Sequence, residues 1–578
     1  MKEAIVAIDF GTSGTTYAFA FMDAKDDIIT AKWDIPDAKN STEIILEEDD
    51  YGNLKVLQFG DNCKTYLRRK DNEGKIYYHF KDIKMKLYDN QTSIKSSNND
   101  KVLKLDVVIS KILITIKEAA LKEIKSYRPL TDESKIDWKV TVPAIWKNKS
   151  KEIMLKASKL AGLFKEKEDQ SLFFCLEPEG AACDYVSEKT SDCNAIEIGR
   201  KYIICDIGGG TVDISTHKRI KENNKIYIEE VYPPIGGNHG SSYINKNFMD
   251  RVITKIFGKN AMDKLEKKIN SKEDEDIYEE YYTLLQQIEE FKKISSELKD
   301  DVKRIDCSLF EEIVDEDISN LIDEYNNNCP SDWKIKKKKG FKIFFPYKIM
   351  IDLTKELIVD KVVNHLYNII DDVSDINSII YAGSVASNQF IISMINNQLP
   401  NRIQKYNSSY PSLAIVKGAV IFGLNPFAIK ARISKYTLGV QTREKWDELE
   451  HGKRNDLKYF DEKDKCYYCK NRFSPIILKN KKINVDEIVK KNYSISYSNV
   501  NIIFLKTLFN DVKFTDETES HKRKCIKFGE TEFNVGESYD ENNKDLIIEL
   551  KLGGTYINAK IIYNEIEKSI PFDFSNED

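Results

Sequence analysis

Two short segments of this sequence combine a leading aspartate with glycines and hydroxyl residues. The first begins at Asp9, and the second begins at Asp206 and ends with a further carboxylate, Asp213. Glycine tolerates positive φ, so successive backbone N–H groups can converge on one anion, and hydroxyls add donors without bulk. Because Mg²⁺ keeps most of its waters and takes few carboxylates, Asp9 and Asp206 predict a site for a magnesium-bound polyphosphate. The residues suited to hold the phosphates are Gly11, Thr12, Ser13, Gly14 and Thr15 in the first segment, and Gly208, Gly209, Gly210 and Thr211 in the second.

Each segment directly follows an apolar run of strand length. Residues 4–8 and 201–205 are almost continuously apolar, which is typical of a strand that is buried on both faces. A second short strand is expected after each turn. A single glycine-rich turn would be weak evidence, because such hairpin turns are common. The repetition of one arrangement in two halves predicts a duplicated fold with the phosphates held between the copies.

The remaining patterns alternate helices with strands. Apolar residues recur every three or four positions over residues 102–119, which predicts an amphipathic helix. After residue 428, short β-like runs separated by polar turns predict a separate β-rich domain over residues 428–578. The fold class expected for the whole chain is therefore α/β. Further helices are expected at 149–163, 259–300 and 346–371, and further strands at 139–143, 173–176 and 378–381.

Composition argues against several classes of protein. The chain has 578 residues, too many for one compact core, so two or more folded units are expected. Its 89 Lys and Arg nearly balance 94 Asp and Glu, and the net charge of -5 argues against a nucleic-acid partner. No apolar run approaches the roughly 20 residues that span a bilayer. Ten scattered cysteines and no secretory signal indicate a cytoplasmic protein.

Two other motifs have weaker interpretations. Cys466 and Cys469 form a Cys-x-x-Cys pair, but structural zinc needs four ligands. Packing cysteines are therefore favoured over a zinc or redox site. The basic cluster at residues 333–342 is interpreted as a solvated loop rather than a membrane or nucleic-acid surface.

The two turns give the chain a resemblance to the actin-like ATPase superfamily, and within it to the heat shock 70 kDa protein family. The resemblance covers about residues 1–427 and includes residues 140–144, 177–182, 379–388 and 418–420. The long first turn, residues 80–87 and residues 528–533 look like the divergent heat shock 70 kDa protein 12 branch. The resemblance implies a duplicated actin-like ATPase fold with ribonuclease H-like lobes. Lobe I would take about residues 1–198 and 408–427, and lobe II about 199–407.

The resemblance also implies catalytic roles. Asp9, Asp206 and Asp213 would organise Mg²⁺ and the attacking water, with Asp9 and Asp206 holding the metal mostly through water. Glu177 would orient water near the metal, and Lys84 would place a cation on the γ-phosphate. Phosphoryl transfer to water depends on alignment and charge stabilisation, so these groups would suffice without a covalent intermediate.

Further residues are implied to bind the nucleotide. The hydroxyls and glycines of the two turns would line the β- and γ-phosphates. Gly383 and Ser384 would border the adenosine. Glu289, Lys292 and Ser296 fall at the spacing of the family's adenosine contacts.

The expected function is that of an ATP-binding, slowly ATP-hydrolysing chaperone-like protein whose nucleotide state controls lobe closure. ATP or ADP and Mg²⁺ would be its cofactors. Protein clients or co-chaperones would bind through residues 428–578. Two alternatives remain open, namely a scaffold that binds nucleotide without hydrolysing it and, less favoured, a metabolite kinase on the same fold.

Overall fold

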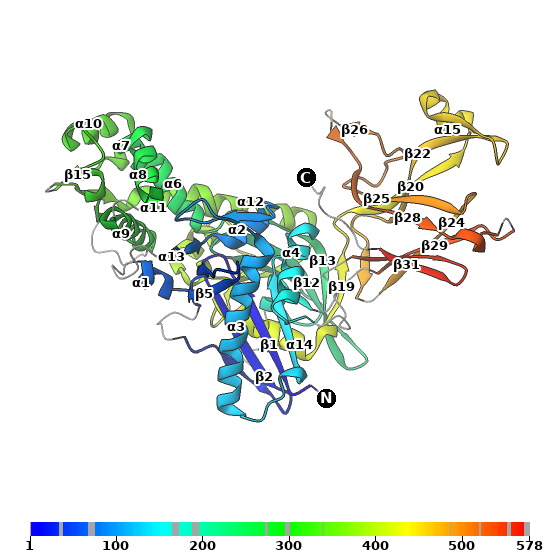
Figure 1. Cartoon of the computed structure of the whole chain (residues 1–578), viewed down its shortest axis with the longest axis horizontal. Coiled ribbons are helices and arrows are strands. Elements are labelled where there is room, and N and C mark those ends of the chain that lie inside the picture. Colours follow the sequence, from blue (N-terminus) through cyan, green and yellow to red (C-terminus); the bar gives the residue numbers. More distant parts are fainter. Residues whose placement is uncertain are drawn as a thin grey trace.

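The computed structural model shows a mixed α/β protein with several sheets (Figure 1). Helices and strands alternate up to about residue 428, and strands dominate the rest of the chain. The structure describes residues 2–33, 39–67, 76–164, 173–187, 196–271, 275–294, 301–338, 340–485, 487–519, 522–540, 542–551 and 557–570.

A five-stranded sheet carries the first turn. Its strands, in spatial order, are β10 (Phe174–Leu176), β9 (Ile136–Val142), β1 (Ala4–Phe10), β2 (Thr15–Phe21) and β3 (Ala24–Thr30). β1 pairs in antiparallel with β2 and in parallel with β9. Helices α3 (Leu105–Tyr127) and α4 (Asn148–Leu160) contribute apolar side chains to its core. Every residue of β1 is buried, as its continuous apolar run predicts.

A seven-stranded sheet carries the second turn. Its strands, in spatial order, are β18 (Gln404–Asn407), β17 (Ile376–Ala382), β11 (Lys201–Ile207), β12 (Val212–Glu222), β13 (Lys225–Gly237), β19 (Ile429–Ile433) and β23 (Lys482–Asn484). β11 pairs in antiparallel with β12 and in parallel with β17, as β1 does with β2 and β9. The surrounding core includes side chains of α6 (Ser242–Phe248), α11 (Tyr347–Thr354), α12 (Asp360–Asp372) and α13 (Gln389–Asn396). Both sheets therefore place two parallel strands on one side of a central strand and an antiparallel hairpin on the other.

Two helices pack against each other between the sheets. Helix α14 (Ala414–Leu424) contacts β1, β2 and β9, whereas α5 (Glu177–Ser187) contacts β11 and β12. A Cβ added to Gly418 would clash with the carbonyl oxygen of Gly180, so the two backbones approach as closely as glycine allows. Small residues such as Ala182 fill the core around this crossing. The two sheets are thus joined through a tight helix pair.

Smaller groups of elements flank each sheet. Beside the first sheet lie β4 (Ile44–Glu48), β5 (Leu54–Phe59), α1 (Asn62–Leu67), β6 (Tyr78–Phe80), α2 (Ile83–Tyr88), β7 (Ser93–Lys95) and β8 (Val102–Lys104). Beside the second lie α7 (Thr254–Phe257), α8 (Lys259–Ser271), α9 (Glu275–Phe291), β14 (Val302–Asp306), α10 (Ile318–Asn328), β15 (Lys336–Lys337) and β16 (Lys342–Pro346), at one end of the molecule in Figure 1. The groups touch where the Tyr282 hydroxyl of α9 lies 3.4 Å from Nδ1 of His79 in β6.

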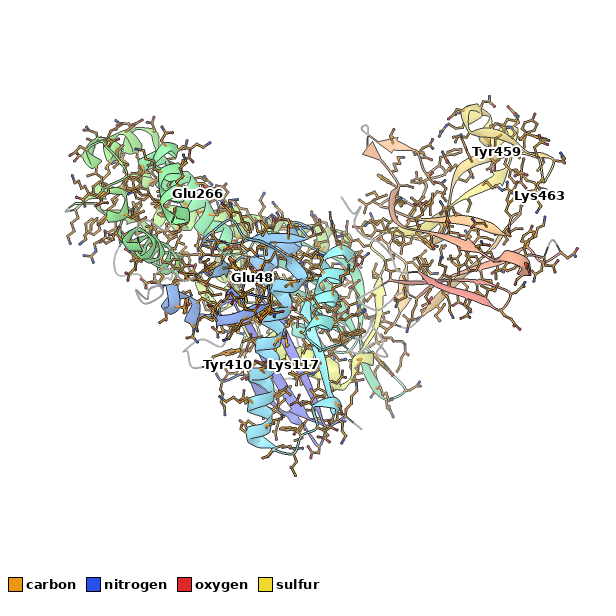
Figure 2. All side chains as sticks on the ribbon, in the orientation of Figure 1. Glu48, Lys117, Glu266, Tyr410, Tyr459 and Lys463 are labelled. Atoms are coloured by element: carbon orange, nitrogen blue, oxygen red, sulfur yellow. The ribbon has the colours of Figure 1, made fainter. Side chains whose placement is uncertain are left out.

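The C-terminal strands gather at the opposite end of the molecule (Figure 1). One sheet contains β21 (Lys458–Asp461), β22 (Cys466–Ile477), β20 (Thr437–Lys445), β25 (Asn499–Thr507) and β28 (Ile526–Asn534). A second contains β24 (Ile488–Ser494), β29 (Asp545–Lys551), β30 (Asn558–Tyr563) and β31 (Ile566–Ile570). Side chains from both sheets share one core. Figure 2 places Tyr459 and Lys463 in this group, far from Glu266 in the helical group of α8. Short elements α15 (Glu448–His451), β26 (Thr518–Glu519) and β27 (Lys522–Arg523) complete it.

The edge of the seven-stranded sheet is built from residues that follow position 428. β19 pairs in parallel with β13, and β23 pairs with β19. Arg432 of β19 forms a bidentate ion pair with Glu179 of α5, with Nε–Oε1 2.6 Å and Nη2–Oε2 2.7 Å. The side chains are only 11% and 2% exposed. A buried charge pair therefore fastens β19 to α5, the helix that packs between the two sheets.

The structure confirms the mixed α/β class and the strands expected beside both turns. The helix expected over residues 102–119 begins at Leu105, because residues 102–104 pair as β8, and it continues to Tyr127. The helix expected over residues 346–371 is divided, with a π-helical turn between α11 and α12. Among the helices of the described ranges, none combines the length and the apolar character needed to cross a bilayer.

Candidate functional site

The first turn is held by a segment that follows β3. The hydroxyl of Thr42 donates to the carbonyl of Gly11 at 2.7 Å and lies 2.8 Å from the hydroxyl of Thr15. Thr15 and Asn40 exchange two backbone hydrogen bonds of 2.7 and 3.0 Å. A Cβ on Gly11 would clash with the carbonyl of Gly14, so the turn is as tight as its glycines permit.

The second turn is held from behind by the loop that follows β13. Within the turn, the N–H of Gly208 donates to the carbonyl of Thr211 at 2.9 Å. The N–H of Ser242 donates to the carbonyl of Gly209 at 2.7 Å, and a Cβ on Gly240 would clash with Gly209. The conformation of this turn therefore depends on a second glycine-containing segment.

The two turns lie against each other. A Cβ on Gly209 would meet the Oγ of Ser13 at 2.6 Å, and one on Gly210 would clash with the hydroxyl of Thr12. A cavity of about 370 Å³, its open mouth included, lies where they meet. Its wall consists of Asp9, Gly11, Thr12, Ser13, Gly14, Lys39, Lys84, Glu177, Asp206, Gly208, Gly209, Gly210, Thr211, Gly383, Ser384 and Ile415. Most of the residues expected from the sequence to form the site are therefore brought together.

Asp9 is buried and has two partners. Lys39 donates to its Oδ2 at 2.5 Å, and the Thr141 hydroxyl of β9 donates to its Oδ1 at 2.9 Å. Burial alone would raise the pKa of Asp9, but the charges of Lys39 and Lys84 and these hydrogen bonds outweigh burial, so the pKa lies below its usual value. Asp9 is therefore ionised at neutral pH.

Lys84 and Glu177 form a second ion pair in the wall. The ammonium of Lys84, in α2, donates to Oε1 of Glu177 at 2.5 Å, and both side chains are 4% exposed. Burial, together with the charge of Asp9, raises the pKa of Glu177 despite the attraction of Lys84. The pair brings residues 93 positions apart to one side of the cavity.

Asp206 and Asp213 lie opposite each other on β11 and β12. Burial, with the charges of Glu177 and Asp213, raises the pKa of Asp206 well above its usual value. Burial and Glu177 raise the pKa of Asp213 to about 7, although Asp213 accepts the backbone N–H of Ala144. One carboxylate oxygen of each aspartate has no hydrogen-bond partner among the described residues. Asp206 faces the cavity, whereas Asp213 lies behind its wall.

The residues expected to contact adenosine are only partly placed at the cavity. Gly383 and Ser384 line it, and Gly383, at φ 88°, packs against Oδ1 of Asp206. Glu289 and Lys292 lie behind the second turn, because the ammonium of Lys292 contacts the Ser241 carbonyl at 3.4 Å and Oε2 of Glu289 at 2.7 Å. Ser296 falls outside the described residues.

The carboxylates at the cavity fit a hydrated magnesium ion. Oδ1 of Asp206 is buried without a hydrogen-bond partner in the described part of the chain, and Asp9 lies in the same wall. Buried polar atoms are normally hydrogen-bonded. Water molecules around Mg²⁺ would supply both the missing donors and the missing positive charge.

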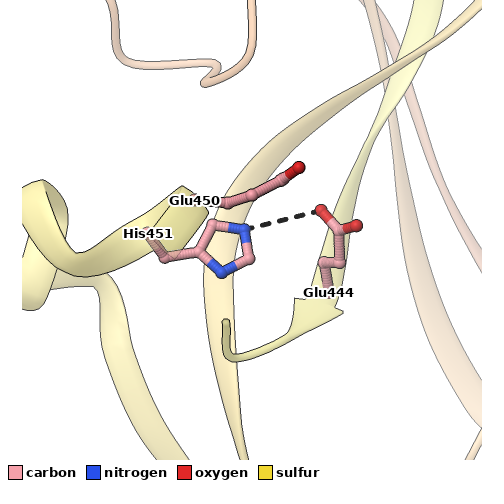
Figure 3. Close-up of side chains that lie close together, drawn as sticks. All are labelled: Glu444, Glu450 and His451. Carbon is pink, nitrogen blue, oxygen red and sulfur yellow. Dashed lines mark ion pairs between the residues drawn. The ribbon is translucent and has the colours of Figure 1, made fainter. Parts of the chain in front are cut away.

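A second group of possible metal ligands lies in the C-terminal strands (Figure 3). It consists of Glu444, Glu450 and buried His451, whose Nε2 lies 3.6 Å from Oε2 of Glu444. His451 Nδ1 accepts the backbone N–H of Asp447, so the neutral ring carries its proton on Nε2 and cannot bind a metal there. Arg472 already neutralises Glu444 at 2.7 Å. The group is therefore better explained as a hydrogen-bonded ion network.

Of the two wall residues that motif reasoning missed, Ile415 is apolar and Lys39 is charged. Lys39 lies in a polar stretch with no periodicity and belongs to none of the recognised motifs. The only available signal is indirect, since a polyphosphate site surrounded by carboxylates needs cations, and Lys84 alone supplies one.

Cys466 and Cys469, the Cys-x-x-Cys pair of the sequence, lie three positions apart on strand β22 and so point to opposite faces of it.

Comparison with known proteins places the chain beside one family. Heat shock 70 kDa protein 12A of Mus musculus is 24% identical over 563 residues, which cover 85% of this chain and 79% of that protein. Heat shock 70 kDa protein 12B of Homo sapiens is 25% identical over 316 residues, or 44% of this chain and 45% of that protein. The resemblance to the heat shock 70 kDa protein family is confirmed. No family model matches the chain.

A further relative matches less than half of this chain. Chaperone protein HscA homolog of Rickettsia typhi is 26% identical over 254 residues, which cover 43% of this chain and 37% of that protein. Similarity over most of the chain is thus seen with the protein 12 branch, as the long first turn indicates.

Proposed function

We propose that this chain binds ATP or ADP with Mg²⁺ between its two sheets and hydrolyses ATP slowly, as a chaperone-like protein related to heat shock 70 kDa proteins. The observation that carries the proposal is the meeting of two glycine turns around one cavity that also contains Asp9, Lys84 and Glu177. Names of the similar proteins, which include heat shock and chaperone proteins, support the same class.

The proposed chemistry assigns a part to each group in the wall. Backbone N–H groups and hydroxyls of the two turns bind the β- and γ-phosphates. Asp9 and Asp206 would hold a hydrated Mg²⁺, which would supply positive charge to the triphosphate. Lys84 stabilises charge on the γ-phosphate, while Glu177 positions the attacking water. Asp213, opposite Asp206 on β12, acts through its charge on Asp206.

The equal strand order around β1 and β11 supports a duplicated actin-like ATPase fold. We assign lobe I to about residues 1–198 and 408–427, and lobe II to about 199–407. The β-rich domain over residues 428–578 is the proposed site for protein clients or co-chaperones. Nucleotide state would bias the angle between the lobes, and the contact between Tyr282 and His79 would close the outer side of the cleft.

Single-turnover hydrolysis of ATP by the wild type and the Asp206→Asn variant tests the proposal. The variant keeps the shape of the side chain but loses the negative charge that faces the cavity. Removing one well-placed electrostatic group commonly slows catalysis about 10²–10³-fold, and a loss of this size is expected here. Nucleotide affinity measured in parallel separates a loss of chemistry from a loss of binding.

Asp315→Asn is the matched control, because that side chain is 98% exposed and lies outside the cavity wall. It should hydrolyse ATP at the wild-type rate. Equal and negligible rates in all three proteins, with nucleotide still bound, would make the chain a non-hydrolysing scaffold. Transfer of phosphate to an added metabolite rather than to water would make it a kinase.

A further inference from the structure

Lys39 is a cation held at the cavity by one of the proposed metal-binding carboxylates. Its ammonium donates to Oδ2 of Asp9 at 2.5 Å, and its side chain is 17% exposed. Lys84, the other cation in the described part of the wall, is paired with Glu177. Lys39 and the proposed metal would therefore both need the same carboxylate, that of Asp9.

The backbone of Lys39 is fixed against the first turn. Asn40 exchanges two backbone hydrogen bonds with Thr15. A Cβ on Gly14 would lie 2.9 Å from the Cβ of Lys39, which shows how closely the two segments pack. Only the flexible four-carbon stem of Lys39 is then free to carry its ammonium from one acceptor in the cavity to another.

The charge of Lys39 acts on more than one carboxylate. Besides its partner Asp9, the carboxylates of Asp206 and Glu177 line the same cavity and attract its ammonium. A hydrated metal between Asp9 and Asp206 would place a second positive charge beside this ammonium. Like charges at such short range repel each other strongly in a buried site.

We propose that Lys39 is a substitute cation, which pairs with Asp9 when no metal is bound and moves to the phosphates when a metal-bound nucleotide occupies the cavity. The inference rests on the proposed nucleotide site. Lys39 is a positioning residue for Asp9 in the first state and a phosphate ligand in the second. Lys39 therefore weakens the binding of a metal ion without nucleotide, but it strengthens the binding of a metal-bound nucleotide.

Lys39→Gln separates these two effects. Without the ammonium, Asp9 is available to a metal, so Mn²⁺ binding to nucleotide-free protein should become about 10-fold tighter. ATP binding in the presence of Mg²⁺ should become about 10-fold weaker, because a charge-assisted hydrogen bond to phosphate is lost. Isothermal titration calorimetry with MnCl₂ alone, and then with ATP and Mg²⁺, measures both.

Two further variants complete the experiment. Lys39→Arg keeps the charge and can bind a carboxylate with two donors, so it should weaken Mn²⁺ binding relative to the wild type. If Lys39→Gln fails to fold, Lys39→Arg still tests the proposal, because its Mn²⁺ affinity is expected to fall rather than rise. Lys156→Gln is the control, since that lysine is 57% exposed on α4 and lies outside the wall.

Opposite shifts of metal and nucleotide affinity in Lys39→Gln support the proposal, since a merely structural lysine would weaken both. Unchanged affinities, or a parallel loss of both, would overturn the role of Lys39 while leaving the nucleotide site intact. If wild-type protein bound no ATP in the presence of Mg²⁺, the proposed function would itself be wrong, and the role of Lys39 with it.

Discussion

The two turns occupy equivalent places in their sheets but have opposite electrostatic environments. Asp9 and Asp206 each lie near the end of a central strand, beside an antiparallel partner. Asp9 is paired with Lys39, and its pKa is lowered. Asp206 is surrounded by Glu177 and Asp213, and its pKa is raised. Strand pairing therefore determines where each carboxylate lies, whereas residues from distant parts of the chain determine its charge.

The difference shows how a repeated arrangement can serve two purposes. Asp9 is stabilised by a cation of the chain itself, whereas an ionised Asp206 is costly to bury without a partner. A cation bound between the two aspartates would therefore stabilise the ionised form of Asp206 more than that of Asp9. Replacing each aspartate in protein free of metal and nucleotide should therefore change the free energy of unfolding by different amounts.

The largest expected effect is on stability. Asp9→Asn leaves Lys39 without its carboxylate and should lower the free energy of unfolding by about 2–3 kcal/mol. Asp206→Asn removes a buried carboxylate that forms no ion pair within the described ranges, and should leave stability unchanged or raise it. Urea unfolding midpoints of the two variants, without metal or nucleotide, measure the difference. Equal losses in both would show that the two sites are electrostatically alike.

A smaller effect, on ATP affinity, is expected from a substitution that pushes the two turns apart. The methyl group of Gly209→Ala would press on the Oγ of Ser13. Overpacking of this kind costs about 1–2 kcal/mol, which corresponds to roughly 10-fold weaker ATP binding. Calorimetry with ATP and Mg²⁺ measures the loss. Ser13→Gly in the same protein removes the obstructing hydroxyl and should recover part of the affinity, unless the turns do not face each other.

A further effect concerns pH. The pKa of Asp213 is raised from 3.8 to about 7, so between these values the native state binds more protons than the unfolded state. Stability should therefore fall as pH rises from about 4 to 7 and then level off, with a contribution of up to about 1.4 kcal/mol per pH unit. Asp213→Asn should remove this contribution. Thermal unfolding midpoints of the wild type and Asp213→Asn between pH 4 and about 7 measure this, with Asp315→Asn as control. If the two profiles are parallel, Asp213 is not responsible for the pH dependence.

Patterns within the sequence could predict the local structure of the site but not its charges. Continuous apolar runs before Asp9 and Asp206 predict β1 and β11, because strands covered on both faces are apolar throughout. The glycines of the turns predict their tightness, since other residues would clash there. These features depend on neighbours along the chain, and the structure contains them where expected.

Other features depend on residues that only the fold brings together. No pattern connects Lys39 with Asp9, or Tyr282 with His79, which lies 203 positions away. The pKa of Asp206 is raised by burial and by the charges of Glu177 and Asp213, and the contribution of Glu177 is not visible in the segment around Asp206. Similarly, the sequence indicates a β-rich part after residue 428 but does not reveal that β19 completes the edge of the second sheet.

The ion pair between Arg432 and Glu179 limits how the C-terminal strands can move. Detaching β19 would leave the buried carboxylate of Glu179 without its Arg432 partner, at a cost of about 3–5 kcal/mol. The strands are therefore more readily displaced together with α5 than away from it. Glu177, two residues before Glu179, begins that same helix, so one helix both supplies a carboxylate to the cavity wall and anchors the C-terminal strands.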